Sequence, residues 1–267
     1  LLAAEPPRVT ALKDARVVLA PGRVLEKATP VVRKGVIVAV GPNVAIPPDA
    51  VVHDLSGRTV YPGLIDPHVT LSRLSGKRDA PADDDEAPAF GPRRPTAPAA
   101  PATGNVHPSS RLRAERRAVA EVVLKDEVKE QLRALGFTTV NAVPDRGIFR
   151  GRSAVLSLGD GSVAQNVVLA REAQVVASDL EADGEDRYPN SKMGATAVIR
   201  QTILDARWLR EAEAAFAAGP ANKERPERVE TWAALGDVIQ GKETVAMETP
   251  DVLELLRSAS LAKELGL

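Results

Sequence analysis

The first sixty residues alternate short apolar segments with turn residues. Segments 15–19 and 36–40 are rich in valine and other apolar residues, a composition typical of strands. Lys34-Gly35 lies directly before the second segment, and a glycine there can supply the positive φ that a tight hairpin requires. The pattern predicts a small all-β unit, a β-sandwich, over residues 1–60.

From residue 111 onward, apolar residues recur with helical spacing between short apolar strands. Strands are expected at 137–143, 153–158, 167–170 and 244–247. One face of a long helix is marked by Ile199, Ile203, Ala206, Leu209, Ala212 and Phe216. A final helix begins after Thr249, and its predicted buried stripe consists of Val252, Leu255, Leu256, Ala259 and Ala262. Strands that alternate with helices favour parallel pairing, which fits a β/α barrel after the β unit.

Residues from about 75 to 110 show no apolar periodicity. An acid run, Asp83–Glu86, is followed by prolines and alanines. Such a composition cannot bury enough apolar surface to offset the entropy of ordering. We therefore expect a flexible surface insertion at about 75–110, and a cation held by the acid run is the alternative.

Composition excludes several classes of protein. Hydrophobic residues make up 44% of the 267 positions and aromatic residues only 3%, so a large core would be aliphatic. A net charge of -1 argues against nucleic acid as a partner. No apolar run reaches the roughly 18 residues of a membrane span. The absence of cysteine excludes disulfides, thiolate metal sites and cysteine nucleophiles.

The first four residues, Leu1–Ala4, are apolar and end in small side chains. This pattern resembles the end of a secretory signal and predicts a periplasmic or secreted protein. The alternative is that this stretch continues an upstream sequence, in which case the protein would be cytoplasmic.

A specific motif opens the second part of the chain, where Tyr61-Pro62-Gly63-Leu64-Ile65-Asp66 runs into Pro67-His68-Val69-Thr70. With 135–140, 151–155 and 193–201, it makes the chain resemble the amidohydrolase superfamily, especially its imidazolonepropionase-like branch, along nearly the whole sequence. The resemblance implies a (β/α)₈ barrel with a β-sandwich. It also implies a metal-activated water that attacks an amide or cyclic C–N bond at the C-terminal ends of the barrel strands.

The same resemblance identifies candidate metal ligands. It places His68 at the first histidine of a His-x-His pair, whose second position is Thr70, and a hydroxyl is a poor ligand for zinc. A later His-Ala-His corresponds to 247–249, which leaves Glu248 as a candidate ligand, and Asp66 is a third. The alternatives are a histidine retained by packing and an aspartate that makes a structural hydrogen bond. We expect no cofactor in this chain itself, and zinc or another divalent cation if it is active.

The resemblance also implies eight barrel strands, whereas this sequence reaches only about the fifth. The predicted fold class is therefore α/β, a partial (β/α)₈ TIM barrel over 61–267 preceded by a small β-sandwich. Unpaired strand edges and exposed aliphatic faces are unfavourable. We expect a second polypeptide or a C-terminal continuation to complete the barrel, within an oligomer.

Three functions remain compatible with these patterns. The first is an amidohydrolase-like subunit that is catalytically silent and structural within a larger assembly. The second is a metal-dependent hydrolase of amide or non-peptide C–N bonds, whose active site is completed by a partner chain or a further C-terminal region. The third is a protein that binds a small polar ligand at the mouth of the barrel.

Overall fold

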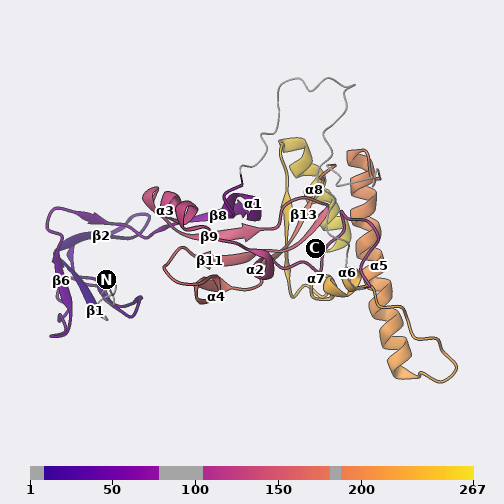
Figure 1. The fold of residues 1–267 in the computed structure, drawn as a ribbon, viewed down its shortest axis with the longest axis horizontal. Helices are drawn as coiled ribbons and strands as arrows, with labels where there is room; N and C mark the ends of the chain where they lie inside the picture. The colour runs from indigo at the N-terminus through magenta and orange to yellow at the C-terminus, as the bar shows by residue number, and fades with distance from the viewer. Residues whose placement is uncertain (1–8, 78–104, 181–187) are drawn as a thin grey trace. The chain divides into compact units, whose positions relative to one another are not determined.

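The structure is a computed structural model that describes residues 9–77, 105–180 and 188–267. The candidate export segment Leu1–Ala4, the acid run Asp83–Glu86 and most of the predicted insertion lie outside the described residues. The protein is mixed α/β and forms two compact units, which divide between Leu64 and Ile65 (Figure 1).

The first unit consists of short strands, and residues 9–60 contain no helix. Its strands are β1 (Val9–Lys13), β2 (Ala15–Ala20), β3 (Arg23–Ala28), β4 (Val31–Arg33), β5 (Val36–Ala39), β6 (Val51–Asp54) and β7 (Thr59–Val60). They form two sheets in the orders β5-β4-β1-β6 and β3-β2-β7. Lys34 and Gly35 have φ values of 50° and 78° between β4 and β5. Two consecutive positive φ angles are typical of a type I′ turn, so the predicted hairpin is confirmed.

The first half of the second unit is a four-stranded sheet in the order β12-β11-β9-β8. Its strands are β8 (Leu64–Thr70), β9 (Phe137–Val143), β11 (Ala154–Ser157) and β12 (Val167–Leu169). The helices that accompany it are α1 (Leu71–Leu74), α2 (Ala118–Glu121), α3 (Asp126–Ala134) and α4 (Val163–Asn166). Leu74, Leu132, Val140 and Leu156 are all buried in one aliphatic cluster, which joins α1 and α3 to the sheet.

The second half is a three-stranded sheet accompanied by two long helices and two short ones (Figure 1). The strands are β10 (Phe149–Arg152), β13 (Ala173–Ala177) and β14 (Thr244–Glu248), and the helices are α5 (Lys192–Ala218), α6 (Glu230–Ala234), α7 (Gly236–Ile239) and α8 (Val252–Leu265). The predicted stripe of α5 is buried from Ile199 to Leu209. No residue of α5 beyond Leu209 is buried, and Figure 1 shows that end of the helix extending away from the sheet.

Strand direction differs from the prediction in part. β13 and β14 pair in parallel, as a βαβ crossover requires, and α5 lies between them in the sequence. β9 with β11, β11 with β12 and β10 with β13 are antiparallel. Residues 144–153 join β9 to β11, and residues 158–166 join β11 to β12. Both connections are too short for the helical crossover that parallel neighbours need. The described residues accordingly contain neither a closed (β/α)₈ barrel nor a clear β-sandwich.

The prediction for the last helix is wrong about which face is buried. Val252, Leu255 and Leu256 of α8 are exposed, whereas the buried positions are Glu254, Ser258, Leu261 and Leu265. Leu261 and Leu265 join the core that includes α5. Lys192 at the start of α5 binds the buried carboxylate of Glu254 at 3.0 Å. These contacts orient α8, so its apolar N-terminal residues face away from the core.

Candidate functional site

Two of the predicted site residues meet at one edge of the second unit. His68 lies near the C-terminal end of β8, and Glu248 is the last residue of β14. Their side chains approach within 3.0 Å, from His68 Nε2 to Glu248 Oε2, although 180 positions separate them in the sequence. Both side chains are partly exposed. The structure therefore brings together two of the three candidate ligands at the C-terminal ends of their strands.

Arg150 and Asp179 complete this cluster. Glu248 pairs with Ala177 in the parallel register of β13 and β14, so Asp179 follows β13 at the same edge. Arg150 belongs to β10, on the other side of β13. Its Nη1 donates to Glu248 Oε2 at 2.6 Å, and its Nη2 lies 3.4 Å from Asp179 Oδ2. One buried guanidinium thus bridges the carboxylate at the end of β14 and the carboxylate that follows β13.

The turn before β10 fixes the position of Arg150. Gly147 has a φ of 97°, a conformation that suits glycine. Its carbonyl oxygen accepts a hydrogen bond from Arg150 Nε at 3.2 Å, and its N–H donates to Asp179 Oδ2 at 3.0 Å. Each partner of the ion pair is therefore also held by the backbone of this turn.

The cluster shifts the titration of its two half-exposed members. The hydrogen bond to Glu248 raises the pKa of His68 above its usual value. The same bond, with the positive charge of Arg150, lowers the pKa of Glu248. Both shifts favour an ion pair between imidazolium and carboxylate.

Asp66 and Thr70 have local structural contacts. Asp66 Oδ1 accepts a hydrogen bond from the backbone N–H of His68 at 3.1 Å. Thr70 is the N-cap of α1, and its hydroxyl accepts a hydrogen bond from the backbone N–H of Arg73 at 3.3 Å. Asp66 therefore supports the backbone of the strand that carries His68, and Thr70 begins the next helix.

The described side chains do not fit a divalent-cation site. Catalytic zinc sites use three protein ligands and an open position. Within residues 9–77, 105–180 and 188–267, no group of three or more His, Cys, Asp or Glu side chains could hold a metal ion. The oxygen of Glu248 that lies nearest His68 also accepts a hydrogen bond from Arg150. A cation at that oxygen would meet the guanidinium charge, so these side chains do not support a chemical step through a metal.

Sequence reasoning missed Arg150 and Asp179. It placed no strand at 173–177, so nothing indicated that Asp179 follows a strand end beside Glu248. A signal for Arg150 is present in the sequence, because an arginine directly after Ile148-Phe149 interrupts an apolar segment. A charged residue in such a segment is seldom buried without a partner. Its partners, however, could not be identified from spacing.

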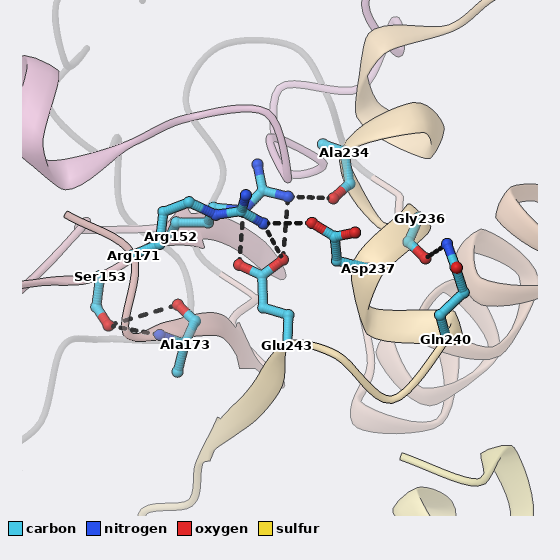
Figure 2. Close-up of polar contacts among 9 residues, drawn as sticks. All are labelled: Arg152, Ser153, Arg171, Ala173, Ala234, Gly236, Asp237, Gln240 and Glu243. Atoms are coloured by element: carbon cyan, nitrogen blue, oxygen red, sulfur yellow. Dashed lines mark hydrogen bonds and ion pairs between the residues drawn. The ribbon is translucent and has the colours of Figure 1, made fainter. Parts of the chain in front are cut away.

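A second ionic cluster lies at the opposite ends of β13 and β14 (Figure 2). Glu243 precedes β14, and its carboxylate accepts two hydrogen bonds from Arg152, at 2.6 and 3.0 Å. Arg171, before β13, binds Glu243 at 3.1 Å and Asp237 at 2.6 Å. Figure 2 shows dashed lines from the Glu243 carboxylate to both guanidinium groups. In β/α barrels the N-terminal ends of the strands contribute stability, and active sites lie at the C-terminal ends.

The class of fold follows from a comparison with solved structures. The chain is similar in fold to an amidohydrolase from Thermotoga maritima MSB8, with a TM-score of 0.69 and 19% sequence identity over 97% of this chain. It covers 62% of that protein, so it spans less than two thirds of the neighbour's length. The fold of this chain is therefore amidohydrolase-like.

A short segment of the chain is also similar in sequence to a known enzyme. Over 45 residues, 17% of this chain, it is 56% identical to an imidazolonepropionase from Deinococcus radiodurans. This match covers 11% of the relative. No family model matches the chain. The resemblance to the amidohydrolase superfamily and its imidazolonepropionase-like branch, expected from the Pro62–His68 motif, is confirmed by these two similarities.

Among the described helices, none combines the length and apolar character needed to cross a bilayer.

Proposed function

We propose that this chain is an amidohydrolase-like subunit that is catalytically silent by itself and structural within a larger assembly. In this proposal, residues 61–267 are part of a (β/α)₈ barrel, and a further polypeptide segment completes it. The amidohydrolase-like fold supports the proposal, because the solved relative contains fold beyond the part that this chain matches.

The proposal that the chain is catalytically silent rests on the few possible metal ligands at the C-terminal edge of the strands. Metal-assisted hydrolysis needs a cation that activates water, and such a cation needs several imidazole or carboxylate ligands. Here His68 and Glu248 pair with each other, and the hydroxyl of Thr70 caps a helix. The described residues contain no third ligand positioned to complete a site.

An unpartnered surface supports the structural role. β14 is the last strand of its sheet, so one of its edges has no strand partner among the described residues. The helix that follows, α8, exposes Val252, Leu253, Leu255 and Leu256, each by more than half. Adjacent apolar side chains at such exposure are typical of a surface that another segment covers. We propose that a further strand and helix, from a continuation or a second chain, pack here.

The test of silence is a hydrolysis assay of the full chain with added zinc or manganese. Amides, dipeptides and cyclic imides are the substrates, and products are detected by mass spectrometry. The wild type should show no turnover above that of a His68→Ala variant. Turnover that His68→Ala abolishes would contradict the proposal.

The test of assembly is native mass spectrometry of protein purified under native conditions. A companion chain, a longer polypeptide or an oligomer is expected. A folded 28.3 kDa monomer without any companion would contradict the structural role.

One observation favours a second candidate function. His68 and Glu248 converge at the C-terminal ends of their strands, the edge at which β/α barrels carry out chemistry. A partner chain or further C-terminal region that supplied the remaining ligands would give a metal-dependent hydrolase of amide or non-peptide C–N bonds, with zinc or another divalent cation. The same assay on the complete assembly distinguishes the two functions, because only the second predicts turnover that depends on His68.

A further inference from the structure

The C-terminal part of α5 leaves the core that buries the rest of the helix. Its buried stripe ends at Leu209, and none of residues 210–218 is buried. Figure 1 shows this part of α5 extending away from the sheet. Most helical stability in proteins comes from the packing of an apolar face, so a helical segment without such packing is marginal in water. A partner that covers this segment would therefore stabilise it.

One face of this segment is apolar and borders a groove. Four residues recur there with helical spacing and line the groove: Trp208, Ala212, Ala215 and Phe216. Residues 223–227 form the rest of the lining, and the groove has a volume of about 470 Å³. Lys223 Nζ donates a hydrogen bond to the carbonyl oxygen of Ala215 at 2.9 Å, which ties the returning chain to the helix. The side chain of Trp208 is 55% exposed at this groove, and exposed tryptophan is enriched among the anchors of protein interfaces.

The charges around the groove favour a second copy of this chain as its occupant. Four lining residues are charged, two basic and two acidic: Lys223, Arg225, Glu224 and Glu227. A surface with balanced charge does not repel an identical surface. Under two-fold symmetry, each acidic residue can face a basic residue of the other copy. A strongly charged partner such as nucleic acid would find no such match.

The apolar face is also symmetric about Ala212. Trp208 and Phe216 lie one helical turn before it and one after it. Two α5 helices that pack antiparallel with Ala212 at the two-fold axis would place Trp208 of each copy against Phe216 of the other. The small side chain at the axis allows the helix axes to approach to about 8 Å.

We propose that this chain forms a two-fold dimer in which the C-terminal parts of two α5 helices pack antiparallel, with Trp208 of each copy in the groove of the other. The proposal names one partner in the assembly of the proposed function. It rests on that function only in the statement that the chain works within an assembly.

Analytical ultracentrifugation of the full chain at micromolar concentrations tests the dimer. The wild type should sediment as a dimer whose fraction rises with concentration. Trp208→Glu replaces an aromatic anchor with a charge, so its dissociation constant should rise about 30-fold or more. Because Trp208 is exposed in the monomer, this variant should still fold. Val123→Glu is the matched control, since Val123 is 56% exposed in the same unit and does not line the groove, and this variant should dimerise as the wild type does.

Disulfide trapping tests the register of the two helices, because the chain has no cysteine of its own. Ala212→Cys places one thiol of each copy beside the two-fold axis, so mild oxidation should give a covalent dimer. Ala197→Cys is the control, at an exposed position of the same helix. At about 1.5 Å per residue, the two copies of residue 197 would lie about 45 Å apart, so this variant should not crosslink.

Three results would each overturn the proposal. The first is a wild type that stays monomeric at every concentration, and a different protein bound through Trp208 would then be the occupant of the groove. The second is a dimer that Trp208→Glu weakens no more than Val123→Glu does, which would place the interface elsewhere. The third is equal crosslinking of Ala212→Cys and Ala197→Cys.

The fate of the dimer and that of the proposed function can be told apart. A companion chain bound at α8 would leave the proposed function standing even if the α5 dimer fails. Hydrolytic turnover that depends on His68 would contradict the proposed silence without changing the result for the dimer.

Discussion

Glu243 holds together the ionic cluster at the N-terminal ends of β13 and β14 (Figure 2). Its side chain is 6% exposed, and its main partner Arg152 is 11% exposed. Substitution Glu243→Gln keeps the shape of the side chain, replaces one oxygen by an NH₂ group and removes the charge. Arg152 then remains buried, with a neutral amide that can accept only part of its hydrogen bonds.

The expected cost follows from burial. Removal of one member of a buried ion pair typically costs about 3–5 kcal/mol, because the other charge stays uncompensated. The bond from Arg171 to Glu243 adds little, since Arg171 is half exposed and also binds Asp237. We therefore expect Glu243→Gln to lower the free energy of unfolding by about 3–5 kcal/mol.

The chain offers a matched control in the pair Arg200–Glu264, which joins α5 to α8. Its geometry is also bidentate, with bonds of 2.6 and 2.8 Å, but its side chains are 40% and 51% exposed. Glu264→Gln should therefore lower the free energy of unfolding much less than Glu243→Gln does, because solvent screens an exposed ion pair. Urea unfolding followed by tryptophan fluorescence measures both variants, because Trp208 and Trp232 lie in the second unit. Equal losses in the two variants would refute the argument from burial.

Three further predictions concern the site and its supports. The pair of His68 and Glu248 requires a protonated imidazole and an ionised carboxylate. Its hydrogen bond raises the pKa of His68 and lowers the pKa of Glu248. The pair should therefore stabilise the fold most between pH 4.5 and pH 6.5, the ordinary pKa values of the two groups. This stabilisation should decline as the pH rises through the folded-state pKa of His68 or falls through that of Glu248. A difference in free energy of unfolding between wild type and His68→Ala that does not change with pH would contradict this prediction. Gly151→Ala should destabilise by at least about 2 kcal/mol, because φ is 109° and the new Cβ would lie 2.6 Å from a backbone oxygen, whereas Gly236→Ala, with open space at its Cβ, should be neutral or stabilising in the same urea assay. Thr70→Ala should cost about 1 kcal/mol through the lost cap of α1, and an unchanged urea midpoint would show that the cap is dispensable.

Local patterns in the sequence were sufficient for many elements. The strand 137–143, the stripe of α5 up to Leu209 and the hairpin at Lys34-Gly35 all appear as predicted. Each depends on residues that are neighbours in the chain, since strand and helix periodicities and turn conformations are local properties. The motif that ends at His68 also indicated an amidohydrolase-like fold, which the structural similarity supports independently.

The candidate site depended on contacts that no local pattern encodes. His68 and Glu248 were singled out separately, from two short motifs, and nothing in their spacing placed them 3.0 Å apart. Arg150 and Asp179 were not singled out, because their importance comes from the pairing of β10, β13 and β14. The order and direction of strands in a sheet therefore decide which ionisable groups share an edge.

The same distinction applies to α8. Its apolar spacing determined that a helix forms after Thr249, but the predicted cap at Thr249 is wrong, because Asp251 is the N-cap and accepts a hydrogen bond from the backbone N–H of Glu254. Only the tertiary structure decided which face is buried: ion pairing draws Glu254 inward, and Leu261 and Leu265 pack into the core with α5. A helix with apolar residues on more than one side can bury only the face that its neighbours contact, and those neighbours are fixed by the rest of the fold.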